Sequence, residues 1–377
     1  MPAIHGWCAR GWEEVRDAFA ANFARHGDVG AACAVYRRGL PVVDLWGGVA
    51  DHVAGRPWEE DTVQIVFSAT KGITAACVNL LVERGLLDVD APVATWWPEF
   101  AAARKGAIPL RWALCHKAGL AAVEGDFTLA EVLAWDPVVA AIAAQAPNWE
   151  PGTAHGYHVR SYGWILGEVV RRATGRSLGR FFADEIARPF GLDFRIGTRE
   201  PDLARCARMI PPDPLVSLAD VFGAGSLMAR VMNGPSGLFA YDDMWNRPDV
   251  LAAEMPSSNG VGSARALARL YAALVDDVDG ARILEPSTVA TACIVQSEGP
   301  DRVILLPTAF GLGFSLQPII SPGAGARAFG HHGAGGSLGF ADPERDLAFG
   351  YVSTRMKFDP AGDDRTTGLV AAVYGSL

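Results

Sequence analysis

Residues 67–72 of the chain read Phe67-Ser68-Ala69-Thr70-Lys71-Gly72 (FSATKG), and an apolar segment follows them directly. Its apolar residues recur at helical spacing, which predicts a helix over residues 68–84 with Ser68 in the first turn and Lys71 on the same face. The pattern also indicates that this end of the helix is buried. A lysine is unfavourable there, because the helix dipole and the loss of water both disfavour a cation.

The Ser68–Lys71 pair has the residue types of an activated serine nucleophile. Burial and positive potential lower the pKa of a lysine amine, so that a neutral Lys71 can accept the hydroxyl proton of Ser68. The same potential favours the developing alkoxide, and the backbone N–H groups of the first turn can point at a reacting carbonyl. Serine is also a common helix cap, so Ser-x-x-Lys alone does not decide between the two interpretations.

Composition and charge narrow the possible partners. Half of the 377 residues are hydrophobic and 20% are charged, as in a globular protein of about two folding units. The formal net charge is −9, and the 33 lysines and arginines form no basic block. This argues against a nucleic acid or an anionic membrane as partner, since both require a clustered basic surface.

The N-terminal residues carry Glu13 and Glu14 where a signal peptide has an apolar core of about 7–15 residues. No later segment offers about 18 uninterrupted apolar residues, so we expect a soluble cytoplasmic protein. The six cysteines contain no Cys-x-x-Cys pair and are expected to be buried thiols. No His-Glu-x-x-His spacing is present, and we predict neither a metal site nor a cofactor.

Periodicity divides the chain into three parts. A helix is predicted over residues 11–26, and two β-prone runs around Arg38-Gly39-Leu40-Pro41 predict an antiparallel hairpin. Residues from about 68 to 280 are predicted to be mainly helical, and residues 364–377 are predicted to form a closing helix. Strands are predicted again at 309–317, 336–342 and 347–356.

Strands near both ends with helices between them suggest one antiparallel sheet built from the two termini. We therefore predict a discontinuous sheet domain of residues 1–67 and 281–377, and a mainly helical domain of residues 68–280. The active site is expected at their interface.

Two other stretches can bear functional residues. In NWEPGTAHGYHVRSYGWILGEVV, a Pro-Gly turn leads to Tyr157 ahead of a helix, although an aromatic residue there is more often a packing residue. In FGHHGAGGSLGFADPERD, we predict that His331 lies on a strand edge. The glycines that follow it allow a substrate to approach the backbone closely.

The stretches FSATKG, PGTAHGYHV and GHHGAGGSLGF, in this order, resemble the three signature elements of the serine β-lactamase and penicillin-binding-protein superfamily. They are most similar to the class C β-lactamase-like branch that includes the family VIII carboxylesterases. LRWALCHKAGL and RPFGLDFRIG resemble further landmarks, and the resemblance spans roughly residues 25–355. It implies an α+β, β-lactamase-like fold: a mainly antiparallel sheet flanked by N- and C-terminal helices, with an inserted helical domain.

The resemblance also implies roles for individual residues. Ser68 matches the acylated nucleophile and Lys71 its activating partner. Tyr157 matches the tyrosine that relays a proton to or from the leaving group, and its phenol becomes a usable base only beside a cation. The backbone N–H groups of Ser68 and Ala334 would form the oxyanion hole.

Two departures from the superfamily pattern favour an esterase. The β-lactamase Tyr-x-Asn motif is Tyr157-His158-Val159 here, so the amide that binds an antibiotic's acylamino group is replaced by Val159. The Lys-Thr-Gly motif is His331-His332-Gly333, in which a titratable imidazole replaces a permanent cation. Both changes weaken binding of an anionic amide, whereas a neutral ester loses nothing.

Residues 335–339 also match Gly-x-Ser-x-Gly, the nucleophile elbow of α/β-hydrolases, with Ser337 as the serine. That motif requires a strand–turn–helix context, but Ser337 leads into a predicted strand and hairpin. We therefore do not expect Ser337 to be the nucleophile.

The leading hypothesis is a serine carboxylesterase that acts on small, short-chain esters and needs no cofactor. A β-lactamase, a D-amino-acid peptidase or an acyltransferase on the same scaffold stays open, as does a catalytically silent binding protein. Phe239, Tyr241 and Trp245 can form an apolar pocket for the acyl or alcohol group or belong to the core. The sequence predicts no oligomeric state and no natural substrate.

Overall fold

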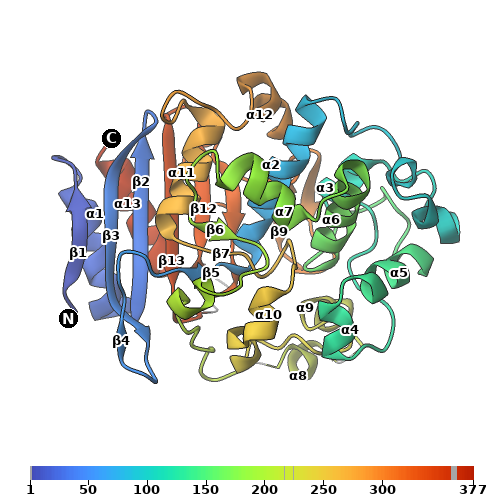
Figure 1. Ribbon diagram of the computed structural model, residues 1–377, viewed down its shortest axis with the longest axis horizontal. Coiled ribbons are helices and arrows are strands. Elements are labelled where there is room, and N and C mark those ends of the chain that lie inside the picture. Colours follow the sequence, from blue (N-terminus) through green and yellow to red (C-terminus); the bar gives the residue numbers. More distant parts are fainter. Residues whose placement is uncertain (1, 216, 224, 358–362) are drawn as a thin grey trace.

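The computed structural model describes residues 2–215, 217–223, 225–357 and 363–377. A large sheet lies between helices on its two faces, and a mainly helical region adjoins one end of the sheet (Figure 1). This is the predicted α+β architecture, so the expected fold class is confirmed.

The main sheet has ten antiparallel strands among the described residues, in the order β1-β3-β2-β13-β12-β11-β10-β9-β8, with β4 paired to β3. Strand β2 pairs with β13 at the centre, with Ala34 opposite Gly350, so the two ends of the chain build one sheet as predicted (Figure 1). The strands are β1 (Ile4–Cys8), β2 (Gly30–Arg37), β3 (Leu40–Asp51), β4 (Arg56–Pro57), β8 (Ser297–Pro300), β9 (Pro307–Phe310), β10 (Ser315–Leu316), β11 (Phe329–His332), β12 (Leu338–Asp342) and β13 (Leu347–Ser353).

A second, three-stranded sheet connects the main sheet to the helical region. It has the strand order β5-β7-β6, and its first strand, β5, comes three residues before Ser68 in the chain. Its strands are β5 (Gln64–Ile65), β6 (Phe194–Arg195) and β7 (Val261–Gly262).

The α-helices are α1 (Glu13–Ala21), α2 (Thr70–Glu83), α3 (Leu110–Leu114), α4 (Leu129–Leu133), α5 (Asp136–Ala144), α6 (Ser161–Thr174), α7 (Leu178–Phe182), α8 (Leu218–Phe222), α9 (Leu227–Met232), α10 (Pro248–Ala252), α11 (Ala264–Val275), α12 (Pro286–Ala292) and α13 (Asp364–Gly375).

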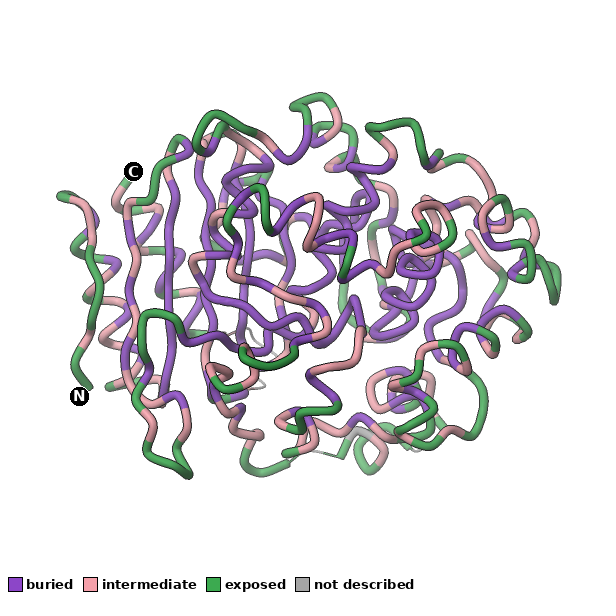
Figure 2. Tube along the Cα trace, viewed as in Figure 1, coloured by how far each residue is buried: buried purple, intermediate pink, exposed green. Residues whose placement is uncertain are grey.

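The central strands are buried on both faces (Figure 2). Alternate residues of β2 point to opposite faces: Cys33 and Val35 pack with α1 and α13, whereas Ala32 and Ala34 belong to the core on the α11 side. A Cβ atom at Gly350 of β13 would lie 2.2 Å from the Ala264 carbonyl oxygen of α11. Small residues on this face therefore let α11 lie directly on the sheet.

This packing differs from the predicted chain division at one element. Helix α11 falls within residues 68–280, which the sequence assigns to the helical domain, yet it packs on β2, β12 and β13. Its amphipathic pattern shows one apolar face but not which partner covers that face. The rest of the predicted division remains a prediction.

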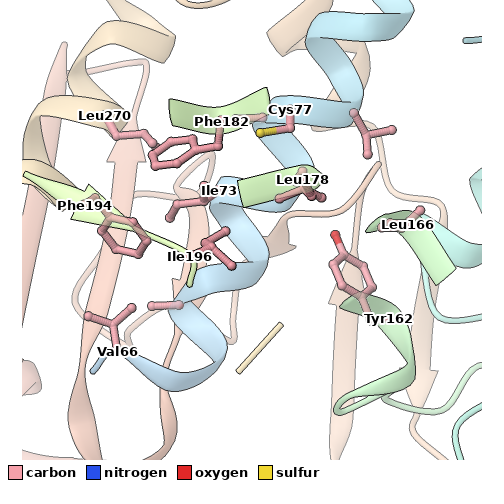
Figure 3. Packing of buried hydrophobic residues seen from close by; sticks show 14 of the residues in the cluster. Val66, Ile73, Cys77, Tyr162, Leu166, Leu178, Phe182, Phe194, Ile196 and Leu270 are labelled. Carbon is pink, nitrogen blue, oxygen red and sulfur yellow. The ribbon is translucent and has the colours of Figure 1, made fainter. Parts of the chain in front are cut away.

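Helix α2 is buried on nearly every side and carries the FSATKG segment into the core. Figure 3 shows Ile73 and Cys77 of α2 among apolar side chains of neighbouring elements, including Phe182 and Phe194. The predicted helix begins two residues later than expected, because Phe67–Ala69 form a 3₁₀ turn ahead of it. Ser68 therefore lies in this preceding turn.

The described residues contain no helix of the length and apolarity required to cross a bilayer. Within the same residues, no group of three or more His, Cys, Asp or Glu side chains is arranged to hold a metal ion. All six cysteines are free; Cys33, Cys77 and Cys115 are buried as expected, and the other three are partly exposed.

Candidate active site

A cleft of about 390 Å³ lies where the C-terminal end of β11 meets the helical region. Strand β11 pairs with both β10 and β12, so the prediction that His331 lies on an edge strand is wrong. The cleft brings together seven of the predicted catalytic, oxyanion-hole and substrate-binding residues, which are Ser68, Tyr157, Val159, His331, His332, Gly333 and Ala334. Lys71 is fully buried behind the cleft and reaches Ser68 from within the core. The other lining residues are Met232, Tyr241, Ile304, Thr308, Phe310, Ser315 and Ile319.

The Lys71 amine is held by three oxygen atoms. Its Nζ lies 2.7 Å from the carbonyl oxygen of Val159, 3.0 Å from that of Ser257 and 3.2 Å from Oγ of Ser68. A neutral amine has two N–H bonds and one lone pair. If the N–H groups donate to the two carbonyls, the lone pair is left for the Ser68 hydroxyl proton, which is the geometry of a general base.

The charge state of Lys71 follows from its surroundings. Burial, followed by the positive charge of Arg160, holds the pKa of the Lys71 amine well below its ordinary value of 10.5. Nζ also lies 4.7 Å from the ring centre of Tyr157. The predicted neutral lysine therefore has two physical causes, loss of water and a second buried cation.

Tyr157 and His331 face each other across the cleft. The Tyr157 hydroxyl lies 3.5 Å from Nε2 of His331, whose Nδ1 lies 2.7 Å from the carbonyl oxygen of His332. An N–H at Nδ1 that donates to this carbonyl leaves Nε2 as the acceptor. Burial, and then Lys71, lower the pKa of His331 well below its ordinary value. His331 is therefore a neutral acceptor for the Tyr157 hydroxyl.

Burial raises the pKa of Tyr157 far above its ordinary value, and a hydrogen bond with Ser68 only partly opposes this effect. A free phenolate is therefore unfavourable in the resting site. Lys71 is the better base for Ser68, and Tyr157 is suited to pass on a proton that it already carries.

The two residues predicted to supply the oxyanion hole, Ser68 and Ala334, both reach the cleft. Across residues 2–215, 217–223, 225–357 and 363–377, neither backbone N–H donates a hydrogen bond to another protein group. Unpartnered N–H groups at a reacting centre can stabilise a developing oxyanion.

The His331-His332-Gly333 motif packs closely against the segment that leads into Ser68. A Cβ atom on Gly333 would lie 2.0 Å from the carbonyl oxygen of Val66, two residues before Ser68, so only glycine fits. The Ser337 hydroxyl donates to the same carbonyl over 2.8 Å and leads into strand β12. Ser337 thus lacks the strand–turn–helix context of an α/β-hydrolase elbow.

Arg160 is a functional candidate that the sequence reasoning missed. This buried side chain donates to four carbonyl oxygens, and its guanidinium lies 4.6 Å from the ring centre of Phe239. The acceptors are Val231, Met232, Gly234 and Phe239. Arg160 holds the segment that carries Met232 to the cleft and places a cation near Lys71. Its position three residues after Tyr157 gave no specific signal.

We expect Arg160→Met to move the acidic limb of the kcat/KM–pH profile to higher pH. Removing the guanidinium removes one cause of the low Lys71 pKa, so the amine stays protonated to a higher pH and cannot act as a base. The other titratable groups around Lys71 are Tyr157, Tyr162, His116 and His331. The measurement is the rate of ester hydrolysis over a range of about pH 5–10.

Arg160→Lys is the matched control for this prediction, because it keeps a cation and loses the forked hydrogen bonds. The acidic limb of the kcat/KM–pH profile of Arg160→Lys should stay near that of the wild type even if turnover falls. An equal movement of the limb in both variants would assign the effect to packing and contradict the electrostatic explanation.

Asp301 is a second residue that was missed. Its buried carboxylate accepts hydrogen bonds from the backbone N–H groups of Tyr157, Val303 and Ile304 over 3.1, 2.8 and 3.0 Å. It therefore fixes Tyr157 and the loop that brings Ile304 to the cleft. Aspartate at the start of a loop is a known turn signal, but the contact with Tyr157 spans 144 positions.

The aromatic residues proposed for a pocket divide between two places. Tyr241 lines the cleft, whereas Phe239 and Trp245 are buried in the core beside Arg160. The apolar wall of the cleft consists instead of Tyr241 with Met232, Ile304, Phe310 and Ile319.

Comparison with known proteins adds independent findings. A protein-family model described as Beta-lactamase matches residues 15–373. The chain is 36% identical over 353 residues to "Esterase/beta-lactamase LipL" of Mycobacterium tuberculosis, a match that covers 90% of this chain and 80% of that protein.

Solved structures of carboxylesterases and related proteins are also similar to this chain. A family VIII carboxylesterase superposes with a TM-score of 0.89 at 39% identity and 100% coverage of both chains. EstA from Arthrobacter nitroguajacolicus Rue61a superposes with a TM-score of 0.89 at 35% identity, covering 99% of this chain and 98% of that one.

Proposed function

Because this chain belongs to the Beta-lactamase family, we propose that it is a serine carboxylesterase that hydrolyses small, neutral esters through an acyl-enzyme on Ser68. The observation that carries the proposal is the contact of 3.2 Å between the Ser68 hydroxyl and a buried lysine with a lowered pKa. The relatives named esterase and carboxylesterase support the same reaction class.

In acylation, the Ser68 hydroxyl proton passes to the lone pair of Lys71 while Oγ attacks the ester carbonyl carbon. The carbonyl oxygen becomes an oxyanion, which the N–H groups of Ser68 and Ala334 stabilise. When the intermediate collapses, the Tyr157 hydroxyl gives its proton to the leaving alkoxide and is reprotonated from Lys71. His331 accepts a hydrogen bond from Tyr157 and keeps its hydroxyl oriented.

Deacylation reverses these proton transfers with water in place of the alcohol. The Tyr157 hydroxyl takes one proton from the water as it passes its own proton to neutral Lys71, and the water oxygen attacks the acyl carbon. The Ser68–acyl bond breaks, the Ser68 oxygen regains a proton, and the acid leaves. Each group returns to its initial state, so one water is consumed for each ester bond.

The lining of the cleft favours a neutral substrate. Among the described residues that form it, none is Asp, Glu, Lys or Arg. Burial lowers the pKa of His332 to about 4 and also lowers the pKa of His331, so both imidazoles are neutral near pH 7. Val159 supplies no side-chain amide to bind an acylamino group. The carboxylate of a β-lactam antibiotic therefore has no cationic partner in this cleft.

We expect p-nitrophenyl acetate and butyrate to be hydrolysed with a kcat/KM about 100-fold above that of nitrocefin, because two missing polar contacts cost about 1–3 kcal/mol each. p-Nitrophenyl dodecanoate should be a poor substrate for a cleft of about 390 Å³. The measurement is initial rates for the wild-type protein across this panel.

Other outcomes of the panel would identify the alternatives. LipL carries both activities in its name, so a β-lactamase is the second candidate, and a higher kcat/KM for nitrocefin than for the esters would establish it. Acyl transfer to an added alcohol in preference to water would indicate an acyltransferase. Release of a D-amino acid from peptides would indicate a peptidase, and failure of a fluorophosphonate to label the protein would indicate a silent binding protein.

A further inference from the structure

A buried arginine from the C-terminal helix contacts the turn that carries the proposed oxyanion donor Ala334. Arg365 lies in the first turn of α13 and is 1% exposed. Its Nη2 donates to the carbonyl oxygen of Gly335 over 2.6 Å. A Cβ atom on Gly336 would lie 2.4 Å from the same Nη2, so no side chain fits between the turn and the guanidinium.

The 334–336 turn contains two glycines, whose backbone conformation is only weakly restricted by their own sequence. Gly335 and Gly336 have φ of 82° and 118°, in the region that glycine enters readily and other residues avoid. Two consecutive glycines have many accessible conformations, so local sequence alone does not fix the peptide planes around Ala334. Backbone hydrogen bonds of Gly336 to Gly333 and of Lys357 to Gly335 hold the turn in part, over 3.2 and 3.3 Å. Arg365 adds the shorter side-chain hydrogen bond to the Gly335 carbonyl.

Arg365 is itself held rigidly by two carboxylates. Nη1 lies 3.0 Å from Oδ1 of Asp28, and Nε lies 2.9 Å from Oδ1 of Asp363. Asp28 also accepts hydrogen bonds from Tyr351 and Ser353 over 2.5 and 2.8 Å. A planar guanidinium with its donors distributed in this way has little freedom to move.

We propose that Arg365 is a positioning residue for ester hydrolysis: held by Asp28 and Asp363, it fixes the 334–336 turn so that the Ala334 N–H meets the developing oxyanion. This inference rests on the proposed function, since it uses the oxyanion role of Ala334. Arg365 does not line the cleft and acts only through the Gly335 carbonyl.

The primary test is Arg365→Lys, which keeps a cation for the carboxylates and loses the fork that reaches Gly335. We expect kcat for p-nitrophenyl butyrate to fall by about 10- to 100-fold with little change in KM, since a lost oxyanion donor costs about 10²–10³ and a misaligned one less. A boronic acid that forms a tetrahedral anion on the nucleophile should bind more weakly by a similar factor, because it uses the same N–H groups.

The opposite end of α13 offers a matched control. The Tyr374 hydroxyl donates to Asp342 over 2.7 Å and ties that end of the helix to the sheet. Tyr374→Phe should lower the melting temperature but leave kcat and boronic acid affinity near their wild-type values. An equal fall of kcat in Tyr374→Phe and Arg365→Lys would assign the effect to helix docking and overturn the proposal, as would an unchanged kcat in Arg365→Lys.

Hydrogen exchange provides a readout that does not depend on activity. The peptide that covers residues 333–337 should exchange faster in Arg365→Lys and not in Tyr374→Phe; equal exchange in wild type and Arg365→Lys would overturn the proposal. Should Arg365→Lys fail to fold, the double variant Arg365→Met/Asp28→Asn removes the buried cation together with the more deeply buried of its two carboxylate partners. Absence of ester turnover in the wild type would instead refute the proposed function, while hydrogen exchange still tests Arg365.

Discussion

Ser68→Ala should lower kcat/KM for p-nitrophenyl butyrate by about 10⁴- to 10⁶-fold, the largest effect expected of any single substitution in this chain. The variant keeps the oxyanion N–H groups and the apolar cleft but has no oxygen that can be acylated. It should remain folded, because Ser68 is partly exposed and its hydroxyl is not needed to satisfy the two carbonyls that hold Lys71. The measurements are initial rates, the melting temperature and fluorophosphonate labelling.

Ser337→Ala is the matched control for this experiment. Its hydroxyl donates one hydrogen bond to the Val66 carbonyl, so the substitution should cost about 1 kcal/mol of stability and retain most of the activity. Peptide mapping should place a phosphonate adduct on the peptide with FSATK. Loss of activity in Ser337→Ala with retention in Ser68→Ala would refute the assignment of the nucleophile.

The sequence predicts the sheet because its pattern is local. The β-prone runs on both sides of the Arg38-Gly39 turn specify a hairpin, and the last part of the chain specifies further strands and a helix. The position of α11 could not be predicted in the same way, since its apolar face fits a helical lobe as well as a sheet. The decisive feature is the lack of a side chain at Gly350, which has a meaning only once β13 and α11 are adjacent.

In the candidate site, the residues that face the reaction could be predicted from short motifs, whereas the residues that support them could not. Ser68, Lys71, Tyr157 and His331 lie in short motifs, and the structure brings all four together. The residues that support these four act through backbone groups or across long separations in the sequence. Ser257 contacts Lys71 through its carbonyl oxygen, and Arg365 reaches Gly335 from the C-terminal helix. A carbonyl acceptor can come from any residue type, so no sequence pattern marks it.

Lys71→Met should lower kcat/KM for the same ester by about 10²- to 10⁴-fold, the usual contribution of a general base. In the wild type, the active form is the neutral amine, so kcat/KM rises with pH through the pKa of Lys71 in the folded protein and then levels off. Since that pKa lies well below 10.5, the plateau should begin well below pH 10.5. In Lys71→Met the residual rate should no longer follow this limb.

Lys105→Met tests whether the effect belongs to the site or to the loss of any buried lysine. Lys105 is also buried, and its Nζ donates to the carbonyls of Ala102, Ala143 and Gln145, none of which lines the cleft. The substitution should lower the melting temperature, because unpaired buried carbonyls cost about 1–3 kcal/mol, yet leave the acidic limb in place. If Lys71→Met kept both its rate and its acidic limb, another group would be the base that activates Ser68.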